Sequence, residues 1–445
     1  MVQTDVPSAE RRSSDSARLN PGAQEVPLAR NSLRPFAAGR ARAWFVVILL
    51  LPAVAICADW PQFLGPNRDG IYPGDDIASS FPATGPPVVW EKNVGAGFSS
   101  PVVANGRLIL FHRLGGKEVV EALDAATGKP IWKFDYPTSY RDDFGFDEGP
   151  RAAPVVAGGQ LYTFGAEGLL HCLQFAQGGK IWSLDTHREF GISKGFFGAA
   201  GSPLVEGPRI FLNVGGKEGA GIIALDKDTG KLLWKATNDE ASYSSPVSVT
   251  FGGKPHLLAF TRAGLVGADP ASGEIYFQFP WRARSHASVN AATPLVIGDL
   301  VFLSASYGTG AVVLRVSGSQ LEKLWSGDDS LSNHYSTSVY YDGHLYGYHG
   351  RQEYSQSFRA IELRTGKVRW SEDGIGAGTV TRAGDRLLLL RENGELLLIR
   401  ATPERFEVLS RAQILPGTVR AYPALANGLF YARNENTLVC VRLRE

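Results

Sequence analysis

The chain has 445 residues, with 45 basic and 44 acidic side chains and a formal net charge of +1. Residues 1–58 contain seven arginines and four acids, so the rest of the chain has 38 basic against 40 acidic residues. This balance lacks the basic excess that nucleic-acid binding requires, so nucleic acid is excluded as an expected partner. The 51 glycines, 26 prolines and 11% aromatic residues are typical of a fold with many turns.

The N-terminal part of the chain has the pattern of a leader. Residues 1–43 are polar and rich in arginine, and an apolar run occupies residues 44–56. The run is short for a bilayer span and follows arginines, as in the hydrophobic region of a secretory signal peptide. We therefore expect residues 1–58 to be a leader with a signal peptide.

Two alternatives to simple cleavage remain open. The first is an uncleaved signal anchor. The second is lipidation at Cys57, although Ile56 stands where a lipobox has a small residue. Membrane association is expected only if the leader or Cys57 anchors the chain.

The segment that follows the leader lacks the alternation of a strand. Residues 59–87 are rich in proline, glycine and aspartate, and we expect an extended arm lying on the folded body. Val88, Val89 and Trp90 then have the pattern of an outermost strand, but no first three strands precede them.

A repeating unit begins at residue 99. Residues 99–134 contain two apolar runs around Asn105-Gly106 and two more around Thr127-Gly128, which predicts four strands joined by tight turns. The proline of the first strand returns at intervals of 42 to 53 residues, which gives eight first strands. The eight positions are Pro101, Pro154, Pro203, Pro246, Pro294, Ser338, Val380 and Pro423.

A second landmark, A-x-D-x-x-T-G-x-x-x-W, marks the last turn and outer strand of the unit. A glycine there supplies the positive φ of the turn, and the tryptophan ring can cover the joint with the next unit. The residues concerned are Asp124, Gly128, Trp132, Trp182, Asp226, Gly230, Trp234, Trp370 and Trp90, with Phe277 in the fourth unit. Units five and seven are expected to lack the landmark and to have weaker joints.

These patterns predict an all-β fold, an eight-bladed β-propeller of four-stranded antiparallel blades over residues 88–445. The last blade is expected to be closed by both ends of the chain. Residues 418–433 would supply two strands, residues 434–444 a third, and residues 88–94 the fourth. Such closure leaves no free sheet edge.

The repeats resemble the tryptophan-docking repeats of the quinoprotein (PQQ) β-propeller superfamily, over residues 59–445. That superfamily includes quinoprotein dehydrogenases, the outer-membrane assembly lipoprotein BamB and exported propellers of unknown role. The opening DWPQFLGPNRDG, residues 59–70, resembles the start of the last group.

The resemblance implies PQQ with Ca²⁺ as a cofactor for the dehydrogenases, often with the PQQ ring against a disulfide of neighbouring cysteines. The chain has no adjacent cysteine pair. Cys172 and Cys440 fall on third strands of blades that are not neighbours, and we expect both to be buried thiols. No cofactor is therefore expected, and PQQ with Ca²⁺ is the alternative.

Several loop residues are candidate ligands. Asp142, Asp143, Asp147 and Glu148 could hold Ca²⁺, because hard cations bind clustered oxygens, but solvated loop charges are the commoner interpretation. Four further loop residues are expected to be hydrogen-bonded rather than ligands: His286, Asn290, Asn333 and His334.

A candidate ligand ring lies at the propeller axis, where the first strands converge. It consists of the residues that stand three positions before each first-strand landmark, of which the informative ones are Phe98, Arg151, Tyr243, Tyr335 and Arg420. Guanidinium groups beside aromatic faces suit a carboxylate or another planar anion. The alternative is that both arginines pair with loop acids such as Asp147 or Glu148.

Two functions follow from these observations. We expect an exported, non-enzymatic binding or scaffold propeller of the cell envelope, with envelope proteins or a small anionic ligand as partners. The alternative is a PQQ-dependent oxidoreductase with its site at the axis. The expected location is periplasmic or otherwise exported, with membrane anchoring left open.

Overall fold

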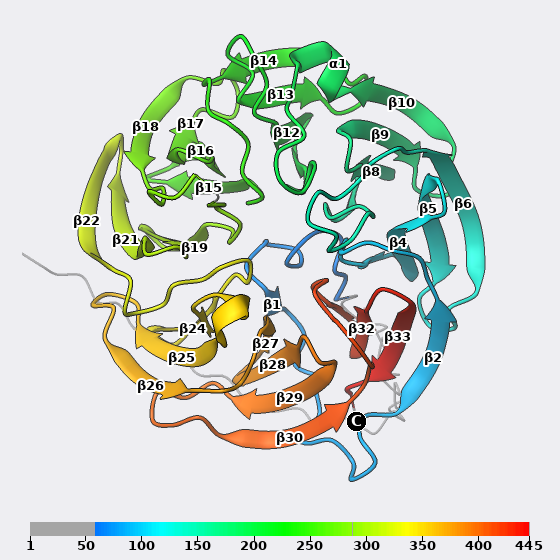
Figure 1. Cartoon of the computed structure of the whole chain (residues 1–445), viewed down its shortest axis with the longest axis vertical. Coiled ribbons are helices and arrows are strands. Elements are labelled where there is room, and N and C mark those ends of the chain that lie inside the picture. The colour runs from blue at the N-terminus through cyan, green and yellow to red at the C-terminus, as the bar shows by residue number, and fades with distance from the viewer. Residues whose placement is uncertain (1–57, 287, 445) are drawn as a thin grey trace, which may run out of the picture. The chain divides into compact units, whose positions relative to one another are not determined.

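The structure, a computed structural model, describes residues 58–286 and 288–444, so the expected leader and Cys57 lie outside the described residues. Eight sheets follow one another in a ring (Figure 1). Helix within the described residues is confined to α1 (Thr186–Phe190) and η1 (Gln352–Tyr354). The predicted eight-bladed propeller of four-stranded antiparallel sheets is confirmed.

In each of blades 1 to 7, chain order runs from the inner to the outer strand. Blade 1 has β3 (Val102–Ala104), β4 (Arg107–Leu114), β5 (Lys117–Asp124) and β6 (Pro130–Pro137). Blade 2 has β7 (Val155–Ala157), β8 (Gln160–Phe164), β9 (Leu169–Gln174) and β10 (Lys180–Asp185). Blade 3 has β11 (Leu204–Glu206), β12 (Arg209–Asn213), β13 (Ile222–Asp226) and β14 (Leu232–Ala236). Blade 4 has β15 (Val247–Phe251), β16 (Lys254–Phe260), β17 (Gly264–Ala268) and β18 (Ile275–Pro280).

Blade 5 has β19 (Leu295–Ile297), β20 (Leu300–Ala305), β21 (Gly310–Ser317) and β22 (Gln320–Gly327). Blade 6 has β23 (Val339–Tyr341), β24 (His344–His349), β25 (Ser357–Glu362) and β26 (Val368–Glu372). Blade 7 has β27 (Gly378–Ala383), β28 (Arg386–Arg391), β29 (Glu395–Arg400) and β30 (Val408–Gln413).

The eighth blade combines two distant segments of the chain. Its first three strands are β31 (Ala424–Ala426), β32 (Leu429–Arg433) and β33 (Thr437–Arg442), and its outer strand is β2 (Val88–Asn93). β2 pairs antiparallel with β33, and Trp90 stands opposite Cys440. Cys440 and Cys172 are free, buried thiols on third strands, and burial raises the pKa of both to about 12.

The burial pattern follows from blades that pack face to face. The middle strands are covered on both faces, so β28 is a continuous leucine run with every leucine fully buried. The outer strands alternate between exposed and part-buried residues, as in β10. The apolar core is therefore divided into clusters at the joints between blades rather than gathered in one centre.

Tryptophans on the outer strands lie at these joints, each against the last turn of the next blade. An added Cβ at Gly178 would stand 2.5 Å from the Trp132 ring, and one at Gly230 would stand 2.7 Å from the Trp182 ring. The indole N–H of Trp132 also donates to the carbonyl of Phe175, at 3.1 Å. The equivalent bonds are Trp90 to Ala125, Trp182 to Lys227, Trp234 to Pro270, Trp325 to Leu363 and Trp370 to Thr402.

Trp325 corrects the expectation for blade 5. The turn between the third and fourth strands of blade 5 is short and lacks the T-G pattern, so the landmark could not be recognised in the sequence. The outer strand of the blade, β22, nevertheless contains a tryptophan. An added Cβ at Gly366 of blade 6 would stand 2.7 Å from the Trp325 ring. The joint between blades 5 and 6 is therefore built like the joints at Trp132 and Trp182.

The arm crosses the axis of the ring. β1 (Ile71–Tyr72) pairs parallel with β27, the innermost strand of blade 7, and lies near the centre of the ring in Figure 1. Trp60 pairs with Val103 of blade 1, and the Pro61 carbonyl accepts from the Val156 N–H of blade 2 at 2.9 Å.

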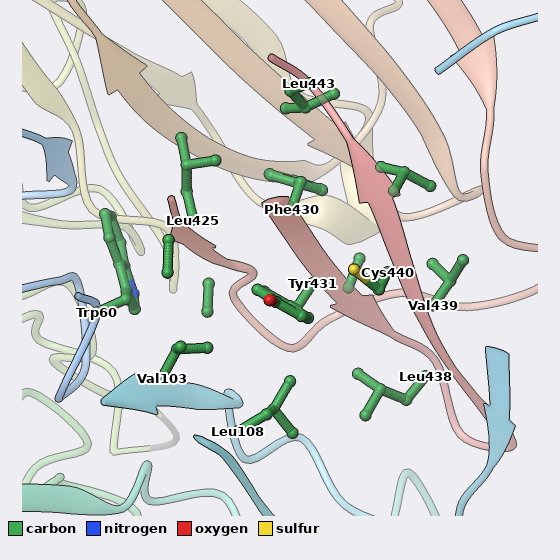
Figure 2. Packing of buried hydrophobic residues seen from close by; sticks show 14 of the residues in the cluster. Trp60, Val103, Leu108, Leu425, Phe430, Tyr431, Leu438, Val439, Cys440 and Leu443 are labelled. Atoms are coloured by element: carbon green, nitrogen blue, oxygen red, sulfur yellow. The ribbon is translucent and has the colours of Figure 1, made fainter. Parts of the chain in front are cut away.

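The arm also completes the joint between blades 7 and 8. The outer strand of blade 7, β30, has no tryptophan to cover this joint. The Tyr72 hydroxyl accepts the Gly428 N–H at 3.0 Å and donates to Asp76 at 2.7 Å. Trp60, Tyr72 and Ile77 belong to one apolar cluster with residues of blades 7, 8 and 1. Figure 2 shows Trp60 beside Val103 and Leu425 in this cluster.

Gly178→Ala tests the tryptophan joint. Gly178 has φ +73°, and its added Cβ would meet the Trp132 ring, so we expect a loss of about 2–4 kcal/mol in the free energy of unfolding. Gly106→Ala is the matched control, because Gly106 also has φ +73° and an added Cβ would meet no atom within 4 Å. Chemical denaturation of both variants measures the difference. Equal losses would contradict a role for the indole contact.

Candidate functional site at the mouth of the axis

The two faces of the propeller carry different connections. Because the blades are antiparallel, turns between first and second strands and between third and fourth strands share one face, which we call the turn face. The other connections share the opposite face, the loop face. The arm enters at the turn face, where Ala58 bonds Asn427 and the Asp59 carboxylate accepts the Asn105 N–H. The candidate ring residues precede the first strands and so belong to the loop face.

Three of the ring residues lie side by side. The guanidinium carbons of Arg151 and Arg420 are each 5.7 Å from the centroid of the Phe98 ring. Arg151 is also 5.6 Å from the centroid of Phe197. Tyr243 joins this group through Phe197, because the two rings are 5.5 Å apart.

Tyr335 joins from blade 6 through a shared acid. Its hydroxyl donates to Glu392 at 2.9 Å, and Arg420 Nε donates to the same carboxylate oxygen at 3.0 Å. Burial, with the Glu392 carboxylate, raises the pKa of Tyr335 well above its usual value. Tyr335 is therefore a neutral donor at neutral pH.

Both arginines have acidic partners, but not the acids that were expected. Arg151 pairs with Asp142 at 3.3 Å and donates to the Asp147 backbone carbonyl at 3.0 Å. The Asp147 carboxylate accepts backbone N–H groups instead, and Glu148 pairs with Arg141 at 2.5 Å. The pairing hypothesis was therefore right about the kind of partner and wrong about Asp147 and Glu148.

Asp142 organises the acidic loop. Its carboxylate accepts the N–H groups of Phe144, Phe146 and Asp147. Partial burial opposes the charged form, but these bonds and Arg151 outweigh it and lower the pKa of Asp142. Across residues 58–286 and 288–444, no group of three or more His, Cys, Asp or Glu side chains is placed to hold a metal ion.

Four phenylalanines, which the sequence analysis missed, form an aromatic cap over the ring residues. Phe144 lies 6.4 Å from Phe146 and 5.3 Å from Phe197, and Phe196 lies 6.0 Å from Phe144. Phe144 is 55% exposed and Phe146 is 45% exposed. The sequence contains a signal for this cap, because F-G-F at residues 144–146 and F-F at residues 196–197 stand in polar loops that precede first strands.

The other loop candidates are hydrogen-bonded residues. The Asn290 amide donates to the carbonyls of Thr261 and Trp281, and the Asn333 amide donates to the Tyr348 carbonyl. The His334 ring bonds Tyr307 and Gln352, and the His286 carbonyl accepts from Arg262.

Below the mouth, a belt of hydroxyl groups links neighbouring first strands. The Ala153 N–H donates to Ser202 Oγ at 2.8 Å, the Ser202 N–H to Ser245 Oγ at 3.0 Å, and the Thr293 N–H to Thr337 Oγ1 at 2.9 Å. Each of these residues immediately precedes a first-strand landmark, a second repeat that the sequence analysis did not use.

Arg68 of the arm lies inside this belt. It is 2% exposed and donates to Gln62 at 2.9 Å, to the Pro246 carbonyl at 3.0 Å and to the carbonyls of Ser202 and Pro203. Phe63 packs edge-on against Tyr422, with ring centroids 5.1 Å apart. The arm thus fills the axial space beneath the mouth.

This architecture defines the class: a propeller whose outer-strand tryptophans lie on the turns of neighbouring blades. Residues 116–372 and 281–445 match the family model described as "Outer membrane protein assembly factor BamB". The chain belongs to that family. Among the described residues, no helix is long and apolar enough to cross a membrane.

Curated relatives fall into two groups. The chain is 27% identical over 198 residues to outer membrane protein assembly factor BamB of Burkholderia pseudomallei, covering 43% of this chain and 45% of the relative. It is 30% identical over 142 residues to quinohemoprotein alcohol dehydrogenase ADH-IIG of Pseudomonas putida, covering 31% of this chain and 19% of the relative. The chain therefore spans less than half of each of these proteins.

Solved structures support the fold. BamB from Moraxella catarrhalis has a TM-score of 0.57 at 14% identity, covering 80% of this chain and 97% of that one. The computationally designed Ika8 protein has a TM-score of 0.57 at 13% identity, covering 80% and 100%.

The residues at the axis do not fit PQQ with Ca²⁺. The nearby carboxylates Asp142 and Glu392 are each paired with an arginine, and within the described part of the chain neither belongs to a group of three or more potential metal ligands. Arg68 and Phe63 of the arm occupy the space beneath the mouth, and the two free cysteines of the described residues, Cys172 and Cys440, lie in blades that are not neighbours.

Asp142→Ala tests how the acidic loop is held. The variant removes the charged partner of Arg151 and leaves three backbone N–H groups without their acceptor, so we expect the free energy of unfolding to fall by about 1–3 kcal/mol. Asp143→Ala is the control: Asp143 is 61% exposed and pairs with Lys194, and its loss should stay within about 0.5 kcal/mol. Chemical denaturation measures the stability of both variants, and amide exchange over residues 140–150 measures how firmly the acidic loop is held in each. Similar behaviour of the two variants would rule out the anchoring role.

Proposed function

We propose that the protein is an exported, non-enzymatic binding or scaffold propeller of the cell envelope. The observation that carries the proposal is the arm, which fills the axis with the chain's own residues. The axial space is where a propeller would otherwise hold a small molecule. With that space filled, the loop-face mouth and its aromatic cap are the surface left for recognition.

The chemistry of the mouth favours recognition over catalysis. Arg151 and Arg420 lie against aromatic rings and are each neutralised by one carboxylate. Exposed Phe144 and Phe146 add apolar area beside them. Aromatic and arginine side chains together are typical of residues that dominate protein interfaces.

The family and the leader support the proposed location. The matched family is described as an outer membrane assembly factor, and residues 44–56 have the pattern of a signal peptide. We propose export to the periplasm, with anchoring through the leader or Cys57 as the alternative. N-terminal sequencing of the mature protein distinguishes these forms.

The oxidoreductase alternative is tested by reconstitution. We expect that the purified protein, incubated with PQQ and Ca²⁺, reduces no artificial electron acceptor with alcohols or sugars, because the arm fills the axis and the described residues there form no metal-ligand group. A quinoprotein alcohol dehydrogenase assayed in parallel provides the positive control. Stoichiometric retention of PQQ together with dye reduction would overturn the scaffold proposal.

The anion hypothesis for the ring is tested with a panel of carboxylates. Arg420 donates through Nε to Glu392, which leaves its two terminal nitrogens for a ligand. We expect carboxylates to raise the melting temperature of the native protein and the Arg151→Ala/Arg420→Ala double variant to lose this effect. Arg405→Ala is the control, because it removes a 72% exposed arginine in the turn between β29 and β30, on the turn face opposite the ring. No stabilisation of the native protein by any carboxylate would refute the hypothesis.

A further inference from the structure

A second concave site lies away from the axis, between blades 5 and 6. Its volume is about 650 Å³. Its walls come from the β20–β21 turn, the connection after β22, the β24–β25 connection and the connection after β26. All four connections belong to the loop face. Neither the family nor the sequence motifs assign this cleft a role.

The lining of the cleft consists of polar, aromatic and glycine residues. None of its fifteen residues is Ala, Val, Leu, Ile or Met, and its two arginines are matched by two aspartates. An apolar ligand would find no aliphatic wall. An anion would be opposed by Asp328 and Asp373, and a cation by Arg351 and Arg359, so the lining favours a neutral polar ligand.

Both donors and acceptors line the cleft. His349 Nδ1 accepts the Ser332 N–H at 3.1 Å, which places the ring proton on Nε2. Burial lowers the pKa of His349 to about 4, so the ring is a neutral donor at neutral pH. Asp328 and Asp373 each accept one serine hydroxyl, at 2.7 and 3.2 Å, and retain further acceptor capacity.

Two polar atoms of the lining residues have no hydrogen-bond partner. They are Arg351 Nε and Gln356 Oε1, and Gln356 is 1% exposed. The backbone of the cleft is strained as well, since Tyr307 has φ +66° and Ser355 has φ +63°. Strained backbone and unsatisfied polar groups concentrate at functional sites, because folding alone does not favour either.

An aromatic platform borders these polar groups. The Arg351 guanidinium lies 4.4 Å from the Tyr307 ring centroid and 5.4 Å from that of Tyr354. Tyr354 is 77% exposed. This stack holds a flat ring at the edge of the cleft, where the apolar face of a ligand could pack on it.

We propose that this cleft binds a neutral saccharide. Sugar hydroxyl groups both donate and accept, so they match a lining in which His349 and Arg359 donate while Asp328 and Asp373 accept. The C–H face of a pyranose ring would pack on Tyr354. The proposal is independent of the scaffold function, because it uses none of the residues at the axis.

The experiment screens the intact protein against an array of neutral and anionic oligosaccharides, and titration calorimetry follows for the hits. We expect a neutral oligosaccharide to bind. Tyr354→Ala should weaken it about tenfold, the value of one ring contact. Asp373→Asn should weaken it too, because the charged acceptor is lost. Phe144→Ala, which removes an exposed ring at the axis mouth, should leave it unchanged.

Three results would overturn the proposal. The first is the absence of any neutral saccharide ligand on the array. The second is binding that survives Tyr354→Ala and Asp373→Asn unchanged, which would place the sugar elsewhere. The third is selective binding of anionic probes, with inorganic phosphate as competitor, which would assign the cleft to anions. Because Tyr354 is exposed, its variant should fold, and a melting temperature matching the native protein checks this.

Discussion

The spacing of the ring depends on an indole that reaches from one blade to the last turn of the next. The turn needs a residue with positive φ, and the indole needs a neighbour with no side chain, so one glycine serves both requirements. The indole N–H donates a hydrogen bond to a backbone carbonyl beside the turn, so burying the ring leaves no unsatisfied N–H group. Five joints among the described residues have both the glycine and the indole hydrogen bond, and the joint at Trp370 has the hydrogen bond to the Thr402 carbonyl without a glycine against the ring. The outer strands are fixed at the joints, and the inner strands must then converge on a narrow axis.

The arm fills two places that the tryptophan joints do not cover. An eight-bladed ring has space at its axis, and the joint between blades 7 and 8 has no tryptophan. The arm covers that joint with Tyr72 and then crosses the axis, where Arg68 donates to carbonyls of blades 3 and 4. A buried guanidinium without a carboxylate partner is costly unless its N–H groups are satisfied, and those of Arg68 bond several carbonyls. For this reason the ligand recognition that we propose is placed on the loop face.

The periodic features of the fold could be predicted from the sequence, because turn glycines, first-strand prolines and outer-strand tryptophans recur at a nearly fixed interval. Trp325 was missed because the T-G turn before it is lost, although its position in the blade is kept. The proximity of Phe98, Arg151 and Arg420 could be predicted from equivalent positions in neighbouring blades. The partners of the arginines could not, because Asp142 and Glu392 reach the ring from loops that differ in every blade. The same holds for the aromatic cap and for the cleft between blades 5 and 6.

Hydrogen–deuterium exchange of residues 59–72, with and without PQQ and Ca²⁺, tests most directly the claim that the arm fills the axis. The amides of Trp60, Arg68 and Gly70 donate to backbone carbonyls. We therefore predict that they exchange as slowly as the inner strands, and that PQQ with Ca²⁺ leaves their exchange unchanged. Rapid exchange of this segment, or its release when PQQ is added, would contradict the account and return the axis to ligand binding.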